Sequence, residues 1–372
     1  MKVVYFIPDF SDPAVVRRVE MLIAGGGDVV PIGFRRDVKP VASIAGIPAI
    51  DLGETKDADL GRRTWLVAKH VLGAGRFKSL LNGADVVMAR NLDMLAIAAA
   101  ARRAGAPNAK LVYECLDIHA SMVKPGLRSL MLRKLEGALL RACSLLATSS
   151  PGFIEHYFAV HHRQLPRTLL LENKVLRSAE TVLERPNTVR TPGPPWRIGW
   201  FGKQRCRKSL ECLKEIARLG GDQVEIVIRG RPAAHIFPDL AGEIADLPNM
   251  SFLGPYTYND LVEIYADVHF MWGIEYFDEG ANSDWLLPNR VYEGVYGNAP
   301  IIADRKTETA TWLAAHQAGL LVTDPISDVI ACLRELDGAA YARLEERSHA
   351  IDTKAVACDR DECRQVVAAL AA

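Results

Sequence analysis

The chain has 372 residues, with 45 Lys and Arg against 45 Asp and Glu, and 49% of its residues are hydrophobic. This composition is typical of a globular protein and excludes disordered, fibrous and membrane-spanning classes. The zero net charge hides an asymmetry, because residues 1–180 hold 25 basic and 17 acidic side chains and the remainder holds 20 and 28. Since one core rarely organises more than about 300 residues, we expect two domains.

The N-terminus and the cysteines indicate a cytoplasmic location. The apolar run Val3–Ile7 is followed directly by Pro8 and Asp9, so it does not resemble a signal peptide. No apolar run approaches the roughly 20 residues that cross a bilayer. The seven cysteines include no C-x-x-C pair, which indicates reduced thiols and argues against a zinc site.

Residues 1–178 are predicted to form one α/β domain. Short β-branched runs alternate with longer helical stretches, which is typical of a parallel sheet covered on both faces. Glycines 25–27 follow the first predicted helix and not the first strand, so they suit a helix end and not an NAD-type phosphate loop. The predicted strands are Val3–Ile7, Val29–Ile32, Ala84–Ala89, Lys110–Glu114 and Leu145–Thr148, and the predicted helices are Ala14–Gly25, Leu92–Ala104 and Leu127–Cys143.

A second alternation of the same kind follows a polar, proline-rich segment. We interpret residues 179–195 as a linker, 196–352 as a second α/β domain, and 353–372 as a C-terminal helix that could pack on either domain, including back on the first. The predicted strands are Ile198–Phe201, Val224–Ile228, Met250–Leu253, Val268–Trp272, Ala299–Ala303 and Leu320–Val322, and the predicted helices are Ser209–Leu219, Asn259–Ala266, Arg290–Tyr296, Thr309–Ala315 and Asp359–Ala371.

Four cations follow the first strand of the second domain, within the six positions Lys203–Lys208. A turn from strand to helix presents free backbone N–H groups and the positive end of the helix dipole, so a diphosphate bound there would meet amides and cations together. A solvated basic loop is the alternative. The carboxyl edge of a doubly wound sheet is where ligands bind, which favours the diphosphate.

A short predicted helix carries Arg290 and Glu293 one turn apart. A carboxylate on this helix can accept hydrogen bonds from both hydroxyls of a ribose, while Arg290 and the helix N-terminus meet phosphate. The alternative is a surface Arg–Glu pair worth roughly 0.3 kcal/mol.

The string L-P-N-R-V-Y-E-G-V-Y-G-N-A-P-I-I-A at 287–303 resembles the nucleotide-sugar motif of GT-B-fold glycosyltransferases, P-N-K-x-x-E-x-x-x-x-G-x-P-V-I. I-G-W-F-G-K-Q-R-C-R-K-S-L at 198–210 resembles the phosphate-binding turn of these enzymes, and M-S-F-L-G-P-Y at 250–256 resembles their nucleobase segment. Y-E-C-L-D-I-H at 113–119 resembles their first-domain strand end that faces the sugar. The resemblance covers most of the second domain and scattered points of the first. Within the family, the sequence most resembles bacterial exopolysaccharide glycosyltransferases, such as those assembling succinoglycan.

The resemblance implies an α/β fold of the GT-B type, in which two Rossmann-like doubly wound domains face each other across a cleft. It implies transfer of a sugar from a UDP- or GDP-sugar donor to a polyprenyl-diphosphate-linked saccharide acceptor in surface or exopolysaccharide synthesis. No metal, other cofactor or nucleic-acid partner is expected. Glu293 would bind ribose, and cations would hold the diphosphate. The implied nucleotide-sugar residues are Gly202, Lys203, Arg205, Lys208, Arg229, Tyr256, Asn289, Arg290 and Glu293.

One position departs from the family pattern. Retaining members often carry a second glutamate eight positions before the ribose-binding one, and this chain has Trp285 there. Asp284 is one residue away, and Glu275 and Glu279 are more distant. The choice between inversion and retention therefore stays open.

The candidate catalytic residues of the first domain are Asp117 and His119, which follow a predicted strand. An inverting transferase needs a general base near the acceptor hydroxyl, and a carboxylate there would supply it. A retaining enzyme would use His119 as a contact to the donor sugar instead. Asp12 and Glu20 are competing candidates for the base, and a helix cap or a satisfied loop is the alternative for the pair at 117 and 119.

The predicted helix 127–143 and the loop before it are basic and amphipathic, with leucines at helical spacing and Glu136 as the one acid between residues 122 and 141. Such a helix can lie on anionic lipid, each cation contributing about 1 kcal/mol. A core-packed helix with a solvated basic face is the alternative. Because the acceptors of similar enzymes are polyprenyl-linked, we predict a peripheral location on the inner face of the cytoplasmic membrane. The predicted membrane or acceptor contacts are Lys124, Arg128, Arg133 and Lys134.

Two other functions stay open. A sugar-nucleotide 2-epimerase would share the architecture and the nucleotide site but would act on the donor alone, without acceptor or membrane. A non-catalytic, degenerate transferase that serves as an assembly scaffold is compatible with the departure at Trp285.

Overall fold

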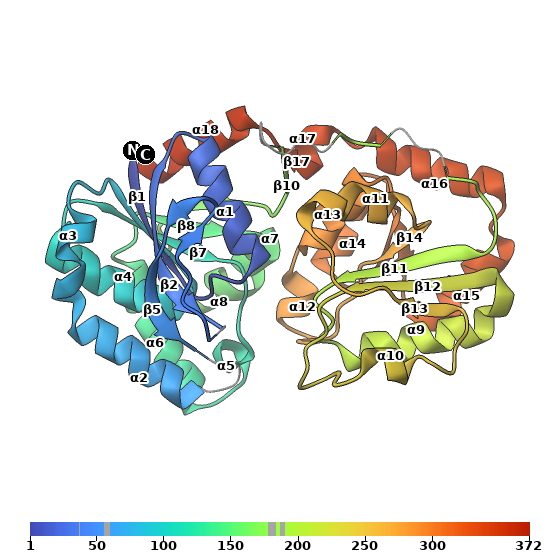
Figure 1. The fold of residues 1–372 in the computed structure, drawn as a ribbon, viewed down its shortest axis with the longest axis horizontal. Coiled ribbons are helices and arrows are strands. Elements are labelled where there is room, and N and C mark those ends of the chain that lie inside the picture. The colour runs from blue at the N-terminus through green and yellow to red at the C-terminus, as the bar shows by residue number, and fades with distance from the viewer. Residues whose placement is uncertain (37, 56–59, 178–183, 187–189) are drawn as a thin grey trace. The chain divides into compact units, whose positions relative to one another are not determined.

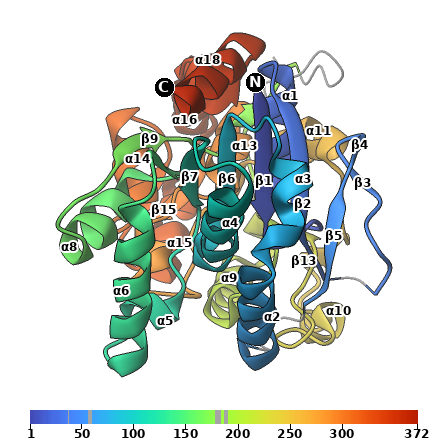
Figure 2. The ribbon, with the colours of Figure 1, turned by 90° about the vertical axis from the view of Figure 1, so that its left-hand side faces the viewer.

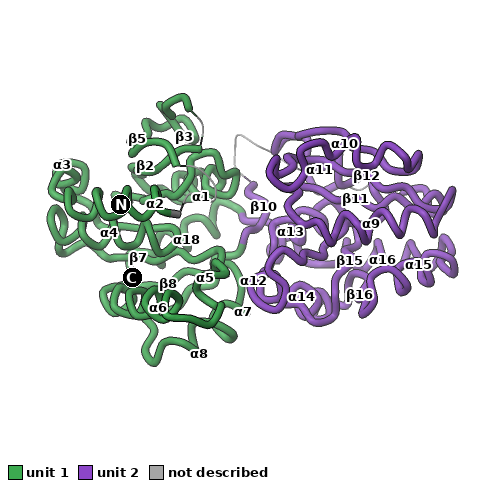
Figure 3. Tube along the Cα trace, turned by 90° about the horizontal axis from the view of Figure 1, so that it is seen from below, with its two compact units in different colours: residues 1–172, 359–372 green, residues 173–358 purple. Residues whose placement is uncertain are grey.

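The protein is described by a computed structural model that covers residues 1–36, 38–55, 60–177, 184–186 and 190–372. The chain divides into two compact units (Figure 3). Unit 1 comprises Met1–Glu172 and Asp359–Ala372, and unit 2 comprises Asn173–Cys358. Each unit contains its own parallel sheet, as the alternation of strands and helices predicts.

Unit 1 is built on a seven-stranded parallel sheet. Its strands are β1 (Lys2–Ile7), β2 (Asp28–Arg35), β5 (Ile50–Glu54), β6 (Val86–Arg90), β7 (Lys110–Cys115), β8 (Leu145–Thr148) and β9 (Arg167–Leu170), in the order β5-β2-β1-β6-β7-β8-β9, and β3 (Ser43–Ile44) and β4 (Ile47–Pro48) form a small antiparallel pair (Figure 1). Because the chain steps from β1 to one side and later to the other, the topological switch point lies between β1 and β6.

The helices of unit 1 pack around this sheet (Figure 2). They are α1 (Pro13–Ala24), α2 (Leu60–Leu72), α3 (Lys78–Leu81), α4 (Asn91–Gly105), α5 (Ala120–Val123), α6 (Leu127–Leu140), α7 (Pro151–Phe153), α8 (Ala159–His161) and α18 (Arg360–Ala371), with a 3-10 turn η1 (Ala74–Phe77) and a π-helical turn η2 (Ile154–Phe158). Helix α4 packs on β1, β6 and β7, and α18 packs against α1 and β7.

The first strand and helix show how local sequence determines these elements. Residues Val3–Ile7 are all buried, as expected for a central parallel strand that is covered on both faces. Helix α1 begins at Pro13, and Asp12 caps it by accepting the N–H of Ala14 at 2.9 Å. A Cβ at Gly25, just after α1, would lie 2.4 Å from the carbonyl oxygen of Cys363, so glycine permits the close packing of α1 on α18.

Unit 2 is built on a six-stranded parallel sheet. Its strands are β11 (Trp196–Gly202), β12 (Val224–Gly230), β13 (Met250–Phe252), β14 (Phe270–Trp272), β15 (Ile301–Asp304) and β16 (Leu320–Val322), in the order β13-β12-β11-β14-β15-β16, and β10 (Val175–Leu176) pairs with β17 (Ala357–Cys358). Its helices are α9 (Arg207–Gly220), α10 (Leu240–Glu243), α11 (Leu261–Ala266), α12 (Asn282–Trp285), α13 (Asn289–Tyr296), α14 (Glu308–Ala315), α15 (Pro325–Glu335), α16 (Gly338–Ala350) and α17 (Thr353–Val356), with 3-10 turns η3 (Gly221–Gln223) and η4 (Tyr258–Asp260).

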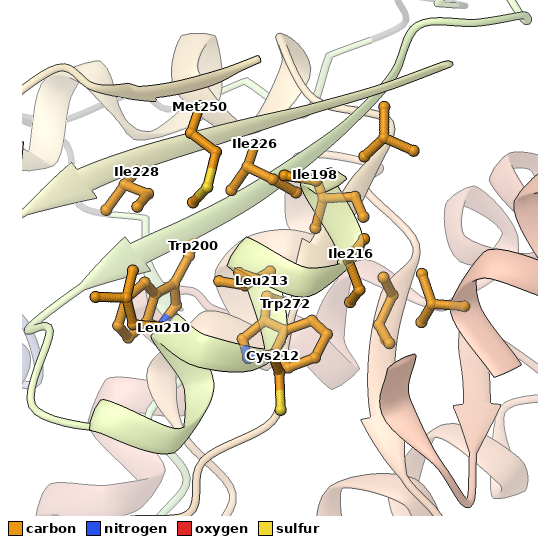
Figure 4. Close-up of a cluster of buried hydrophobic side chains, with 14 of the residues drawn as sticks. Ile198, Trp200, Leu210, Cys212, Leu213, Ile216, Ile226, Ile228, Met250 and Trp272 are labelled. Carbon is orange, nitrogen blue, oxygen red and sulfur yellow. The ribbon is translucent and has the colours of Figure 1, made fainter. Parts of the chain in front are cut away.

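Strand β11 sends its side chains to two hydrophobic cores, one on each face of the sheet. Ile198 and Trp200 pack with Leu213 of α9 in the core drawn in Figure 4. Phe201 joins the core on the opposite face, where α11, α13 and α14 pack. Burial on both faces explains why these strands are continuously apolar.

The unit boundaries differ in detail from the predicted domain limits. Residues 173–177 belong to unit 2, because β10 pairs with β17 there, and the chain returns to unit 1 at Asp359. The C-terminal helix α18, for which both domains were open, lies in unit 1. Residues 179–183 and 187–189 of the predicted linker lie outside the described residues. Elements that the periodicity missed include β5, β9, α2, α15 and α16.

Candidate functional site

In unit 2, the switch point of the sheet lies between β11 and β14, because β12 pairs with one side of β11 and β14 with the other. The chain leaves β11 at Gly202, whose carbonyl oxygen would lie 1.7 Å from a Cβ at Gly230. Glycine at 230, where φ is +135°, therefore lets the ends of β11 and β12 approach closely. The buried Gln204 fixes the turn by donating from Nε2 to the Arg229 carbonyl at 2.9 Å.

The cations after this turn point to different partners. Arg207 forms an ion pair with Glu243 on α10 and stacks on Phe237, so it is held away from the loop that follows β14. Arg205 lies over the ring of Phe277, 4.9 Å from its centroid, on that loop. Arg207 therefore has a structural role, whereas Arg205 contacts the loop that follows β14 at the switch point. Lys203 also has an interaction partner in the structure.

Lys208 on α9 and Lys306 after β15 converge on one carboxylate. Each Nζ lies 2.7 Å from an oxygen of Glu279, and Lys208 also lies 4.0 Å from the ring centroid of Tyr276. The hydrogen bonds from Lys208 and Lys306 lower the pKa of Glu279. The two lysines are about half exposed and Glu279 is about one-third exposed. An anionic ligand could therefore take the position of this carboxylate between the two lysines. The contribution of Lys306 was not predicted from the sequence.

Helix α13 carries Arg290 and Glu293, and these two side chains have different partners. Arg290 Nη2 donates to Glu275 Oε2 at 3.1 Å, and both groups are largely buried. Tyr265 donates its hydroxyl hydrogen to Glu293 Oε2 at 2.9 Å. The alternative of a surface pair between Arg290 and Glu293 is therefore wrong, because each side chain bonds a residue that is distant in the sequence. Arg290 Nη1 is buried without a hydrogen-bond partner, so one donor of this guanidinium is unused.

The C-terminal end of α13 is held by two arginines that sequence analysis did not single out. Arg190 donates to the carbonyls of Gly297 and Asn298 at 2.8 Å each and pairs with Glu345 at 2.6 Å. Arg185 donates to the Val295 carbonyl at 3.2 Å. Cations at a helix C-terminus stabilise the helix dipole, so these contacts fix the helix that presents Arg290 and Glu293.

The remaining predicted nucleotide residues lie near the same edge of the sheet. Asn289 is the first residue of α13, and Tyr256 packs on Phe201 with ring centroids 6.3 Å apart. Arg229 ends β12 next to Gly230. Asp284 lies on α12, where burial raises its pKa, one position before Trp285.

In unit 1, the catalytic candidates follow β1 and β7. His119 is the N-cap of α5, and its Nδ1 accepts the backbone N–H of Ser121 at 3.1 Å. His119 is therefore a helix cap, which is the alternative to a catalytic role that the sequence left open. Asp117 is exposed on the same loop, and Asp12 caps α1 with a side chain that is 43% exposed.

A buried ionic network lies directly behind Asp12. Glu114 of β7 has no exposed surface and accepts hydrogen bonds from Arg18 Nε at 2.6 Å, Arg90 Nε at 2.8 Å and the hydroxyl of Tyr5. Burial by itself raises the pKa of Glu114, but the two guanidinium groups outweigh burial and lower it to about 2. This network could not be predicted from the sequence, because its members come from β1, α1, β6 and β7, which extend over more than 100 positions.

Helix α6 faces outward with its apolar side. Its buried residues are Ser129, Glu136 and Leu140, and Glu136 accepts hydrogen bonds from the hydroxyls of Tyr113 at 3.0 Å and Tyr157 at 2.6 Å. Glu136 and Leu140 thus hold the helix to its unit, whereas most of its spaced apolar residues face solvent and not the core, unlike in the core-packed alternative. Arg133, predicted as a membrane or acceptor contact, is partly buried and donates to the Met122 carbonyl at 2.8 Å. The exposed large apolar residues are Leu127, Leu130, Met131 and Leu135, and the exposed cations beside them are Lys124, Arg128 and Lys134.

Among the described residues, no helix is both long and apolar enough to cross a bilayer. The same part of the chain contains no cluster of three His, Cys, Asp or Glu side chains that could hold a metal ion.

Comparison with solved structures defines the fold. No family model matches the chain. Anabaena HepE (Alr3699), in complex with UDP and glucose, superposes with a TM-score of 0.67 at 16% identity, covering 99% of this chain and 98% of that one. WaaG, a glycosyltransferase involved in lipopolysaccharide biosynthesis, superposes with a TM-score of 0.66 at 14% identity, covering 98% and 99%. At these identities the likeness concerns the fold, which is GT-B.

Sequence comparison shows the family to which the chain belongs. It is 42% identical to the succinoglycan biosynthesis protein ExoL of Rhizobium meliloti (strain 1021) over 377 aligned positions, which cover all of this chain and 93% of the relative. The chain therefore belongs to the family of this succinoglycan biosynthesis protein, and its fold is GT-B. The family resemblance and the α/β GT-B fold class predicted from the sequence are confirmed.

Proposed function

We propose that this glycosyltransferase moves a sugar from a nucleotide-diphospho-sugar to a polyprenyl-diphosphate-linked saccharide. The observation that carries the donor site is the pairing of Arg290 with Glu275 beside Glu293 at the switch point of unit 2. Arg290 keeps one buried donor unused, and Lys208 and Lys306 converge on Glu279, a partly exposed carboxylate in the segment that follows β14. A diphosphate would use these cations, and Glu293 would accept the ribose hydroxyls.

The comparison with HepE supports uridine as the base. HepE was crystallised with UDP and glucose and also with UDP-glucose, and its fold covers nearly the whole of this chain. We therefore propose UDP-sugars before GDP-sugars as donors. Tyr256, which packs on Phe201 near the end of β11, is the aromatic residue we assign to the base.

Calorimetric titration with UDP tests the donor site. In Glu293→Gln we expect UDP affinity to fall at least tenfold, because the amide cannot accept two ribose hydroxyls as well as the carboxylate does. Glu263→Gln, the same change at an exposed position on the neighbouring helix α11, is the matched control and should bind as the wild type does. Equal UDP affinity in wild type and Glu293→Gln would contradict the ribose assignment.

The exposed apolar face of α6 supports a peripheral position on the inner face of the cytoplasmic membrane. Leucines and Met131 face solvent there, and Arg128 and Lys134 flank them, which matches a helix that inserts its apolar side among anionic headgroups. A lipid-linked acceptor is presented at the same surface, so membrane binding would bring unit 1 to its substrate.

Flotation with liposomes that contain phosphatidylglycerol tests this location. The triple variant Lys124→Glu, Arg128→Glu and Lys134→Glu should lose most of its flotation, since each exposed cation contributes about 1 kcal/mol near an anionic surface. A control with the same charge change on unit 2, Arg334→Glu, Arg343→Glu and Arg347→Glu, should float as the wild type does. Unaltered recovery of the first variant would exclude α6 as the anchor.

We also propose that transfer needs no divalent metal. Lys208, Lys306 and Arg290 supply positive charge where a leaving diphosphate would carry negative charge. Transfer measured after chelation with EDTA should equal transfer with added Mg²⁺, and a requirement for the metal would contradict this assignment.

A further inference from the structure

We propose that Glu279 competes with the terminal phosphate of the nucleoside diphosphate for Lys208 and Lys306, and that this competition speeds release of the diphosphate product. The inference rests on the proposed use of a nucleotide-diphospho-sugar and adds a residue that limits how tightly the nucleotide is held. It concerns unit 2 alone, because all the residues that carry it belong to that unit.

One short segment of unit 2 contacts four cations at the carboxyl edge of the sheet. This segment, residues 275–279, connects β14 to α12. The contacts pair Glu275 with Arg290, Phe277 with Arg205, and Glu279 with Lys208 and Lys306. The cations come from the turn after β11, from α9, from α13 and from the residues after β15, so they converge on this one segment.

The two glutamates of segment 275–279 are held differently. The side chain of Glu275 is 4% exposed and bonds both Arg290, at 3.1 Å, and the N–H of Phe277, at 3.3 Å. The side chain of Glu279 is 37% exposed and lies between two lysines that are about half exposed. Breaking a buried ion pair leaves a charge uncompensated in low dielectric, whereas water replaces the partners of an exposed pair at little cost. Glu279 is therefore the carboxylate that a ligand can displace.

The backbone around Glu279 is a turn that does not depend on the Glu279 side chain. The N–H of Asp278 donates to Ser283 Oγ at 2.9 Å, and the N–H of Ser283 donates to the Asp278 carbonyl at 3.2 Å. Gly280 has a φ of +78°, which glycine adopts without strain. Because Asp278, Ser283 and Gly280 determine the turn, the Glu279 side chain can rotate away from the lysines and leave the backbone unchanged.

The charges favour exchange of Glu279 for a diphosphate. Lys208 and Lys306 share the single negative charge of Glu279, and Asp304 lies 3.7 Å from Lys306. The diphosphate of a nucleotide sugar carries two negative charges and several acceptor oxygens, so it binds lysines more strongly than one carboxylate does. A nucleotide therefore displaces Glu279, but the ion pairs that it breaks lower its affinity.

The product binds these lysines more tightly than the donor does. When the bond to the sugar breaks, the terminal phosphate becomes a monoester with a second pKa of about 6, so it gains most of one negative charge at pH 7. Release of product, and not chemistry, limits the turnover of many enzymes. A carboxylate that returns to the same two lysines opposes retention of the product and so speeds its dissociation.

Helix α13 indicates which phosphate meets the lysines. Glu293, which we assign to the ribose, lies one turn from Arg290 on this helix, so we assign the phosphate attached to the ribose to Arg290. Lys208 and Lys306 lie on other elements, and they bond Glu279 at the opposite end of segment 275–279 from the partner of Arg290. We therefore assign them to the terminal phosphate, which UDP has and UMP lacks.

Titration calorimetry with UDP and UMP tests the competition. In Glu279→Gln we expect the Kd for UDP to fall about three- to tenfold, the gain from no longer breaking an exposed ion pair, and the Kd for UMP to stay within about twofold of wild type. Glu243→Gln is the matched control, because it frees Arg207 instead, and it should change neither value. An equal gain for UDP and UMP would reveal a long-range charge effect and overturn the inference, as would an unchanged Kd for UDP.

Surface plasmon resonance with the full-length protein immobilised tests the role in release. Most affinity differences between closely related complexes lie in the dissociation rate, so the koff of UDP in Glu279→Gln should fall about three- to tenfold while kon stays within about twofold. The structural alternative, a surface ion pair without influence on the nucleotide, predicts equal koff values. A koff equal to that of wild type with a faster kon would show that Glu279 obstructs entry, and it would overturn the role in release.

A double-mutant cycle shows whether the gain depends on the lysines. Lys306→Met removes one of the two cations, so adding Glu279→Gln in that background should improve UDP binding by less than about twofold. The full gain in that background would overturn the inference. The wild type separates this inference from the proposed function. A wild type that binds no UDP contradicts the proposed donor site, whereas a wild type that binds UDP as tightly as Glu279→Gln contradicts the competition alone.

Discussion

The two units share a doubly wound architecture, but the charged side chains at their switch points differ in burial and in partners. In unit 1, Glu114 is fully buried and accepts hydrogen bonds from two arginines and a tyrosine, so this carboxylate needs no ligand. In unit 2, Glu279 is about one-third exposed and bridges two lysines that remain accessible. The difference indicates that the buried charges of unit 1 hold one another in place, whereas the lysines of unit 2 remain available to bind an anion.

The loss in free energy of unfolding when one member of an ion pair is removed should therefore differ between the two units. A buried ion pair that loses one member leaves an uncompensated charge in low dielectric, whereas a half-exposed pair is replaced by water.

The largest effect is expected for Glu114→Gln in unit 1. It leaves Arg18 and Arg90 buried without a carboxylate and should lower the free energy of unfolding by about 3–5 kcal/mol. Glu275→Gln in unit 2, where one arginine is affected, should cost about 1–3 kcal/mol. Hydrogen exchange measured by mass spectrometry resolves the two units, and an equal or larger loss of protection in Glu275→Gln would contradict the comparison.

The next effect is the response of unit 1 to acid. The pKa of Glu114 is lowered from its ordinary value of 4.5 to about 2 in the folded protein, because the two arginines stabilise the ionised carboxylate more than burial opposes it. Its stabilisation is therefore complete above pH 4.5 and is lost as the pH falls towards 2. Amides of β1, β6 and β7 should lose protection in this window in the wild type. The same dependence in Glu114→Gln would show that another group is responsible.

A smaller effect concerns UDP binding by unit 2. Arg290→Gln should weaken UDP binding by about 10- to 100-fold, the effect of losing one charge-assisted hydrogen bond of about 1.5–3 kcal/mol. Arg207→Gln is the control, because Arg207 is paired with Glu243 on α10, and its UDP affinity should change less than threefold. Titration calorimetry measures both, and equal losses in the two variants would indicate a nonspecific charge effect.

The smallest effect is expected for Glu279→Gln. Because its ion pairs are half exposed, the free energy of unfolding should change by less than about 1 kcal/mol. Lys208 and Lys306 would then be free of the carboxylate, so UDP should bind several-fold more tightly. Glu243→Gln, which frees Arg207 instead, should leave UDP affinity unchanged. A weaker affinity in Glu279→Gln would indicate that the carboxylate itself contacts the ligand.

Sequence periodicity determined the strands and helices that surround the candidate sites. Strands β1, β7, β8 and β11 and helices α1, α4 and α13 agree with the predicted ranges to within a few residues. Those elements are set by local physics, since an apolar run that is buried on both faces and a capped helix are visible within about ten residues. The nucleotide-sugar motif at 287–303 is likewise contiguous, so it could be recognised from the sequence alone.

The tertiary structure alone decided which charges meet. Arg290 lies one turn from Glu293 but pairs with Glu275, fifteen positions earlier, and Arg18, Arg90 and Glu114 converge although β6 and β7 lie about 70 and 95 residues after α1. It also turned the leucines of α6 outward by burying Glu136 under two tyrosines. Spacing along the chain encodes the period of one element, whereas strand order and the packing of helices on the sheet determine which elements face each other. The class of the protein could therefore be predicted from its sequence, and the partners of its buried charges could not.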